Sequence, residues 1–470
     1  MSENLVPLMP SGTDPDPRPR AREAARSPRT AAPRPEAAAE GSHLLLKVFL
    51  IGLGLRLAYV LVTRGYASPR DHFGFGWEMG RIARALASGR GFADPFRGET
   101  GPTAWVAPVF PLVMAGIFRV FGTYSALSGF LVLAFSSVCS CLTALVLFRM
   151  GSDLFGEVVG RRTAWFWALC PYTIYWPTRV VWDTSLTALL LSLVFWLTVR
   201  VGAESSARLW TAYGILWGLA AVTNPATLAF SVPAWSWAIL RGKRRSGFRW
   251  SFVLGALLLA VLPAGAWMAR NRVVLGRVVF IRDNFGEELR LGNGPGGHGE
   301  WMVWLHPTQS PEEYARYAAF GESRYVDLRG REAVQSILEN LPLFAANSLR
   351  RASWFWLGTT KGESDDVLYA LRNIGFAIGS VLAFAGLLLM RQRKQPEWLL
   401  FLALLALYPA VYYATFVVTR YRHPVEPELV LLIVFAVSCA EPRPLGATRG
   451  DLPVRALGRL SLRKEKELGA

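Results

Sequence analysis

Recurrent apolar stretches constrain the fold of this chain more than any other feature of its sequence. In a bilayer every backbone polar group must be paired within the protein, and for apolar runs of this kind the helix is the structure that does so. Runs suited to crossing a hydrocarbon core of about 30 Å occur at 44–62, 125–148, 163–180, 183–199, 209–222, 226–240, 250–269, 367–390, 398–417 and 424–440. The sequence therefore predicts an all-α membrane protein, a bundle of about ten transmembrane helices with outer-face loops and juxtamembrane helices.

Basic residues between these runs set their direction across the membrane. Lys and Arg are enriched in cytoplasmic loops, and with the N-terminus inside, basic clusters fall in every cytoplasmic turn: 149–162, 200–208, 241–245, 391–394 and the tail after Glu441. The outer face then receives two long loops, 63–124 and 270–366, and three short turns, at 179–183, near Asn224 and at 419–424. We expect these five segments to meet on one face.

One stretch, 103–121, is ambiguous, because counting it as a span would invert every later loop. Trp105 and two prolines suit the headgroup region, so we interpret it as an interfacial helix.

Composition agrees with a membrane protein, since 52% of the 470 residues are hydrophobic and only 18% are charged. The net charge of +17 does not indicate a nucleic-acid partner, because basic residues concentrate in the first 42 positions, the last 30 and the short loops. The expected domains are a disordered cytoplasmic tail over 1–42, a transmembrane domain over 43–440 and a basic cytoplasmic tail over 441–470. The four cysteines lie in apolar stretches and are expected to be buried and unpaired.

Two acidic residues of the first outer loop, Asp71 and Glu78, are candidate general bases, because a carboxylate at that position can take a proton from an attacking hydroxyl or amine. The alternative for Glu78 is a solvent-facing residue of an amphipathic helix, paired with Arg81. His72 is expected to be a polar loop residue. Asp71 is slightly favoured because its loop is free to face an acceptor, whereas Glu78 lies nearer the Ile-Ala-Arg motif, so the residues leave open which carboxylate acts.

Arginines on the outer face are candidate phosphate ligands. Arg270, Asn271 and Arg272 end one span, and Arg420, Tyr421 and Arg422 precede another. A guanidinium binds phosphate through two parallel hydrogen bonds. A single arginine at this depth usually extends toward lipid headgroups, but two arginine pairs on the outer face run against the charge bias and favour an anionic ligand.

Asp183 begins a span from the outer side, where it either caps the helix or orients a donor sugar or an arginine of the phosphate site. Asn224 and Pro225 are expected to form a turn. The segment 341–357 is amphipathic, and the acidic residues and histidines of the second outer loop have no recognised metal spacing. No structural metal or certain cofactor is predicted, although a divalent cation beside a phosphate is compatible with the sequence.

Taken in order, the motifs resemble those of the GT-C superfamily of membrane glycosyltransferases, in the group containing protein O-mannosyltransferases and lipid A aminoarabinose transferases. The resemblance covers about residues 44–440. It rests on the acidic first loop with Ile-Ala-Arg and Gly-Arg-Gly-Phe, on the Pro-Thr-Ala-Trp-Val-Ala-Pro-Val-Phe-Pro stretch, on Arg270-Asn271 with Gly276 and Gly292-Asn293, and on the terminal Arg-Tyr-Arg-x-Pro at 420–424.

This resemblance implies a polyprenyl-phosphate sugar donor, an inverting single displacement with a first-loop carboxylate as base, and an active face outside a bacterial cytoplasmic membrane. It leaves the acceptor open among lipid, glycan and protein. The chain departs from the pattern in two places: Asp71 and Glu78 stand seven residues apart where many members have an adjacent Asp-Glu pair, and Ala107-Pro108 occupies the position of a His-Pro-Pro element. The second departure gives no support to a protein acceptor.

Two other functions fit a polytopic protein with anionic-headgroup sites. A flippase or transporter of lipid-linked sugars would need ionisable residues or broken helices at the bilayer midplane, and the spans contain few, such as Arg56. A non-catalytic scaffold predicts that Arg420 and Arg422 are dispensable.

Overall fold

The computed structural model describes residues 35–359 and 367–441. The chain divides into two compact units, residues 1–46 and 47–470. In the first unit, the described backbone begins at Pro35, which is the first residue of helix α1 (Pro35–Thr63). The expected tails lie almost wholly outside the described residues. Apart from the beginning of α1, the second unit contains all the elements discussed below.

The described part of the chain is helical and contains no strand, so the all-α membrane fold predicted from the sequence is confirmed. Six helices are long and apolar enough to cross a membrane: the 43–63 part of α1, α4 (Ala126–Phe155), α7 (Thr184–Ala203), α10 (Trp250–Leu275), the 370–392 part of α15 (Val367–Gln392), and η4 (Thr419–Val425) continuing into α18 (Glu426–Ala440). Each coincides with one of the ten expected spans.

The other four expected spans are shorter helices, and proline explains where they are interrupted. A proline lacks the N–H that a continuing helix needs. Pro171 separates α5 (Glu157–Leu169) from α6 (Pro171–Arg179), Pro225 lies between α8 (Ala207–Thr223) and α9 (Ser231–Gly242) within η2 (Pro225–Phe230), and Pro409 separates α16 (Trp398–Leu407) from α17 (Ala410–Ala414). In the turn after α8, Asn224 accepts a hydrogen bond from the Ala226 N–H at 3.1 Å.

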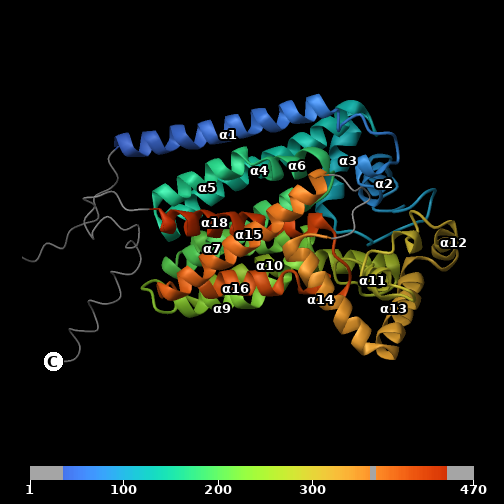
Figure 1. The fold of residues 1–470 in the computed structure, drawn as a ribbon. Coiled ribbons are helices and arrows are strands. Elements are labelled where there is room, and N and C mark those ends of the chain that lie inside the picture. The colour runs from blue at the N-terminus through green and yellow to red at the C-terminus, as the bar shows by residue number, and fades with distance from the viewer. Residues whose placement is uncertain (1–34, 360–366, 442–470) are drawn as a thin grey trace, which may run out of the picture. The chain divides into compact units, whose positions relative to one another are not determined.

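The helices of the two long loops gather at one end of the second unit (Figure 1). The first loop forms η1 (Phe73–Phe75), α2 (Glu78–Ala87) and α3 (Val109–Phe121), a helix too short to count among the candidate spans. The second loop forms α11 (Phe285–Asn293), η3 (Val303–Leu305), α12 (Pro311–Phe320), α13 (Glu322–Glu339) and α14 (Leu341–Leu357). The bounds of α14 are those of the expected amphipathic segment.

An aromatic core joins the two long loops. Phe96 of the first loop is fully buried, and its ring lies 4.9 Å from Trp105 and 4.6 Å from Tyr317 of the second loop, centroid to centroid. Aromatic pairs in such edge-to-face geometry stabilise a core beyond the area that they bury. The two loops therefore form one packed layer.

Helices α8 and α10 approach each other at two glycines on one face of α8. A Cβ atom at Gly214 would lie 2.2 Å from the Ala256 carbonyl oxygen, and one at Gly218 would lie 2.8 Å from the Leu259 carbonyl oxygen. Small residues four apart allow such close packing in membranes.

We predict that Gly214→Ala destabilises the protein by about 1–3 kcal/mol, because the added methyl group has no space and must push α10 away. The matched control is Gly255→Ala in α10, where a Cβ would meet nothing within 4 Å; there the lower chain entropy of alanine should leave stability unchanged or raise it by up to about 1 kcal/mol. Thermal unfolding in detergent measures both, and equal melting temperatures for the two variants would contradict the packing argument.

Candidate functional site

A cavity of about 430 Å³ lies where all five expected outer segments meet. It is lined by residues of the first loop, the turn before α7, the turn after α8, the second loop and the segment 408–424. The polar and aromatic side chains around it are Trp77, Glu78, Trp105, Trp182, Asp183, Asn224, Arg282, Asn284, Glu288, His306, Tyr412, Arg420 and Tyr421. Segments up to about 350 positions apart in the sequence thus contribute to one site, as expected if all five lie on the same face.

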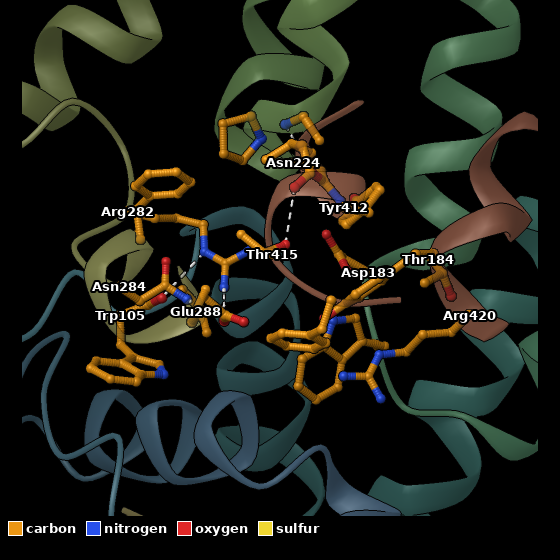
Figure 2. A pocket seen from close by; sticks show the side chains of 18 of the residues that line it. Trp105, Asp183, Thr184, Asn224, Arg282, Asn284, Glu288, Tyr412, Thr415 and Arg420 are labelled. Carbon is orange, nitrogen blue, oxygen red and sulfur yellow. Dashed lines mark hydrogen bonds and ion pairs between the residues drawn. The ribbon is translucent and has the colours of Figure 1, made fainter. Parts of the chain in front are cut away.

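Three carboxylates and two guanidinium groups border this cavity. In the view of Figure 2, Arg282 and Arg420 enter from opposite sides, with Asp183 between them. Asp183 is the N-cap residue of α7, but its side chain makes no capping hydrogen bond to the backbone there and instead accepts one from the Thr187 hydroxyl at 3.5 Å. Coulomb attraction is far stronger in a cavity of low dielectric than in water, so these five side chains dominate what it can bind.

Glu78, in the first turn of α2, is one of the cavity carboxylates. Glu78 is only 4% exposed, and its Oε1 accepts a hydrogen bond from the Thr308 hydroxyl at 2.8 Å. The Nε2 atom of His306 lies 3.8 Å from the same oxygen, and burial lowers the pKa of His306, which favours its neutral form. The solvent-facing alternative for Glu78 does not describe this geometry.

Asp71 does not line the cavity but is linked to Glu78 through two side chains. It forms an ion pair with the buried Arg81, whose Nη1 donates to the Thr308 hydroxyl at 3.3 Å, and Thr308 donates in turn to Glu78. Asp71 has a φ of +54°, a backbone region that is costly for a residue with a side chain. The neighbouring His72 accepts a hydrogen bond from the Gly74 N–H and begins η1.

Arg420 is the cavity arginine with the fewest protein partners. Its guanidinium carbon lies 4.5 Å from the ring centroid of Trp182 and 5.3 Å from that of Tyr421. Its buried Nε has no hydrogen-bond partner within the described ranges. Tyr421 stacks on Tyr412 at 4.3 Å between centroids. Arg420 is thus held by aromatic rings while its hydrogen-bonding capacity remains available to a ligand.

Arg282 and Glu288 form the opposite wall and were not among the residues selected from the sequence. Arg282 Nη2 lies 3.7 Å from Glu288 Oε1, and Asn284 Nδ2 donates to the same oxygen at 2.6 Å. Burial raises the pKa of Glu288, and Arg282 and Arg420 act against that rise. Neither Arg282 nor Glu288 belongs to a recognisable sequence motif. The only signal in the sequence was an arginine of the second outer loop followed six positions later by an acidic residue.

The backbone of residues 103–105, which carries Trp105 into the cavity wall, is held from several directions. Glu322 accepts hydrogen bonds from the Thr103 hydroxyl and, at 2.6 Å, from the Ala104 N–H. The Asp283 N–H donates to the Ala104 carbonyl at 2.8 Å. Arg282 Nε donates to the Trp105 carbonyl at 3.2 Å. The first loop is therefore fixed to the second by polar contacts as well as by the aromatic core.

Three of the expected phosphate ligands make other contacts and do not line the cavity. Arg270 donates to the carbonyls of Thr103 at 2.6 Å and Phe92 at 2.8 Å, and Asn271 donates to the Val279 carbonyl at 3.2 Å. Arg422 pairs with Glu426 at 2.6 Å and donates to the Trp356 carbonyl at 2.9 Å. These side chains tie segments together, because a guanidinium can bridge several carbonyls at once.

Within the described ranges, no group of three or more His, Cys, Asp or Glu side chains is arranged to hold a metal ion. The cavity does bring Glu78, Asp183 and Glu288 to its border.

Residues 105–267 match a protein family described as dolichyl-phosphate-mannose-protein mannosyltransferase. This segment is less than half of the chain, and over it the resemblance to GT-C membrane glycosyltransferases expected from the motifs is confirmed. It includes Trp105, Asp183 and Asn224 of the cavity. No curated protein matches the sequence at a significant level.

Among solved structures, the chain is similar to the archaeal oligosaccharyltransferase AglB from Archaeoglobus fulgidus in complex with an inhibitory peptide and a dolichol-phosphate, with 13% identity, a TM-score of 0.48, and coverage of 86% of this chain and 50% of that one. This chain thus spans about half the length of the archaeal protein. It is also similar to ArnT from Cupriavidus metallidurans bound to undecaprenyl phosphate, with 14% identity, a TM-score of 0.39, and coverage of 85% and 78%.

The protonation of Glu322 gives a testable dependence of stability on pH. Burial raises the pKa of Glu322 to about 7. A carboxyl whose pKa is higher in the folded state stabilises that state at pH values below its unfolded pKa of 4.5, and the stabilisation is lost as the pH rises toward 7. We expect the melting temperature of the wild type, relative to Glu322→Gln, to fall between pH 5 and pH 7, by an amount corresponding to about 1–3 kcal/mol. A difference that is independent of pH would contradict this.

Proposed function

We propose that the protein transfers a sugar from a polyprenyl-phosphate donor to an acceptor hydroxyl or amine. The observation that supports this proposal most is the arrangement of the cavity, which has a buried carboxylate with a fixed hydrogen bond, Glu78, and a guanidinium with unused donors, Arg420. Such a transfer needs a proton acceptor, positive charge at the leaving phosphate and accurate positioning.

The reaction is a single displacement. The acceptor oxygen or nitrogen attacks the anomeric carbon from the face opposite the phosphate, and the bond between that carbon and the phosphate oxygen breaks as the new bond forms. The lipid phosphate leaves with the electron pair, the configuration at the carbon inverts, and the carboxylate of Glu78 takes the acceptor's proton. The products are the glycosylated acceptor and the polyprenyl phosphate.

Glu78 is the proposed base, and Asp71 is a positioning residue that acts through Arg81 and Thr308. Thr308 donates to one oxygen of Glu78 and Arg81 donates to Thr308, so the carboxylate has one preferred orientation. This arrangement refines the expectation that either carboxylate is the base.

Arg420 is the proposed phosphate ligand, Arg282 faces it from the opposite side of the cavity, and Asp183, between them, is proposed to hold hydroxyl groups of the donor sugar. Tyr421 and Trp182 hold the Arg420 guanidinium in place by cation–π contacts. Arg270, Asn271 and Arg422 contribute by keeping the surrounding backbone in position. The site is proposed to face the outside of a bacterial cytoplasmic membrane, because the basic turns of the chain are expected on the inner, cytoplasmic side.

The base assignment predicts unequal effects for the two first-loop carboxylates. We expect Glu78→Gln to lower kcat by about 10²–10⁴, because the amide cannot accept the proton, with little change in the KM for the donor. Asp71→Asn should lower kcat less, since it weakens only the support of Arg81. Purified protein in nanodiscs and a panel of labelled undecaprenyl-phosphate sugars provide the assay. Full activity of Glu78→Gln would refute the assignment, and donor translocation without any glycosylated product would identify a flippase.

The phosphate assignment predicts a defect in donor binding. We expect Arg420→Gln to raise the KM for the donor about 10- to 100-fold, because charge-assisted hydrogen bonds contribute roughly 1.5–3 kcal/mol each. Arg272→Gln is the matched control, because Arg272 is an exposed arginine that donates to the Gly276 carbonyl and does not line the cavity. Native mass spectrometry with undecaprenyl phosphate measures the same contact without turnover. Unaltered lipid-phosphate binding by Arg420→Gln would contradict the assignment.

A further inference from the structure

A second hollow, the α10–α13 groove, lies beside the proposed active site. Its volume is about 940 Å³, and it lies between the segment 277–289, which follows α10, and one face of α13. Gly286 and Gly330 bring these two elements together, because a Cβ at Gly286 would lie 2.3 Å from the Val326 carbonyl oxygen. The groove is therefore built by tight packing of its two walls.

The groove and the cavity share two wall residues, Arg282 and Phe285. Arg282 is tied to the first loop by its hydrogen bond to the Trp105 carbonyl and lies beside Glu288. Phe285 is 56% exposed, so it can turn without disturbing a packed core. A molecule in the groove thus lies next to the Arg282 side of the cavity, across Asp183 from Arg420 (Figure 2).

Apolar side chains line both walls of the groove, Phe285 and Leu289 on one and Val326, Val334 and Leu338 on the other. The end of α10 and the residues after it, which lead into the groove along the chain, expose Val273, Val274, Val278 and Phe280. Along α13, Val334 and Leu338 are about half and two-thirds exposed. Helix α10 as a whole has few buried residues and presents leucines and valines along its length. Exposed apolar patches of this extent indicate contact with lipid or an apolar ligand.

The other edge of the groove is charged. Arg277 pairs with Asp327 at 2.7 Å and also with Asp283, and Arg331 and Gln335 lie further along α13. Apolar side chains on both walls, together with one charged edge, are complementary to a molecule that has an apolar chain and a polar head. It is a poor match for a wholly polar glycan.

We propose that the glycosyl acceptor is a membrane amphiphile whose apolar chain lies in the α10–α13 groove. This inference rests on the proposed function and names the class of its second substrate. The head group passes Arg282 and Phe285, which places its hydroxyl or amine on the Glu78 and Glu288 side of the cavity. The donor phosphate occupies the opposite side, at Arg420, so the two substrates reach the anomeric carbon from different directions, as an inverting displacement requires.

Variants with a charge in the groove test this proposal. The wild type and Leu338→Asp, in nanodiscs containing a total lipid extract of the source cells, are given the labelled undecaprenyl-phosphate sugar that the wild type consumes. We expect at least a tenfold loss of label transferred to solvent-extractable lipid in Leu338→Asp, with donor hydrolysis and the KM for the donor unchanged. Leu349→Asp is the matched control, because Leu349 is a 74% exposed leucine of α14 that does not line the groove, and it should transfer normally.

A second variant keeps the test independent of folding defects. Gln335→Cys, at an exposed position on the groove edge, is treated with a bulky hydrophilic maleimide after purification, alongside wild type treated in the same way. Transfer should fall only after treatment of the variant.

Three results would overturn the inference. Label appearing only in peptide or water-soluble glycan, or normal lipid transfer by both groove variants, would show that no acceptor lipid uses the groove. A raised KM for the donor in both would assign the groove to the donor chain. If the wild type consumes no donor with any acceptor, the proposed function itself fails, and this outcome is distinct from the other three.

Discussion

The attachment of residues 103–105 to the second outer loop is the contact on which the site depends. This short backbone segment is bound by Glu322, by the Asp283 N–H and by the guanidinium groups of Arg270 and Arg282. Because unpaired polar groups are costly to bury, each of these partners restricts where the segment can lie. The position of Trp105 in the cavity wall is thereby determined by residues about 170 to 220 positions away.

Sidedness was the part of the site that sequence reasoning could predict. The alternation of apolar runs and basic turns placed five segments on one face, and Glu78, Asp183, Asn224, Arg282 and Arg420 do border one cavity. Charge bias acts over whole loops, so it is readable without knowing any contact. The continuity of the helices was less accessible, because Pro171 and Pro409 lie inside apolar runs and interrupt helices that hydropathy alone joins.

Individual arginines could not be sorted in the same way. Arg270, Arg420 and Arg422 have similar sequence surroundings, an outer helix end with aromatic neighbours. In the structure Arg270 and Arg422 donate to backbone carbonyls, whereas Arg420 lies over Trp182 with its Nε unpaired within the described ranges. The difference depends on which carbonyls the fold brings near, and that is a property of tertiary packing. Arg282 was missed for the same reason, since its significance comes from Trp105 and Glu288.

The charge of the cavity connects the two substrate sites. With Glu78, Asp183 and Glu288 ionised, the carboxylates outnumber Arg282 and Arg420, and a bound phosphate would add to the excess. Burial raises the pKa of Glu288, so a proton on this side chain can offset part of the repulsion. Glu288 lies next to Arg282, which also borders the α10–α13 groove. At the proposed donor site, a phosphate bound at Arg420 would favour protonation of Glu288, and this protonation would make the Arg282 side of the cavity, next to the proposed acceptor groove, less negative.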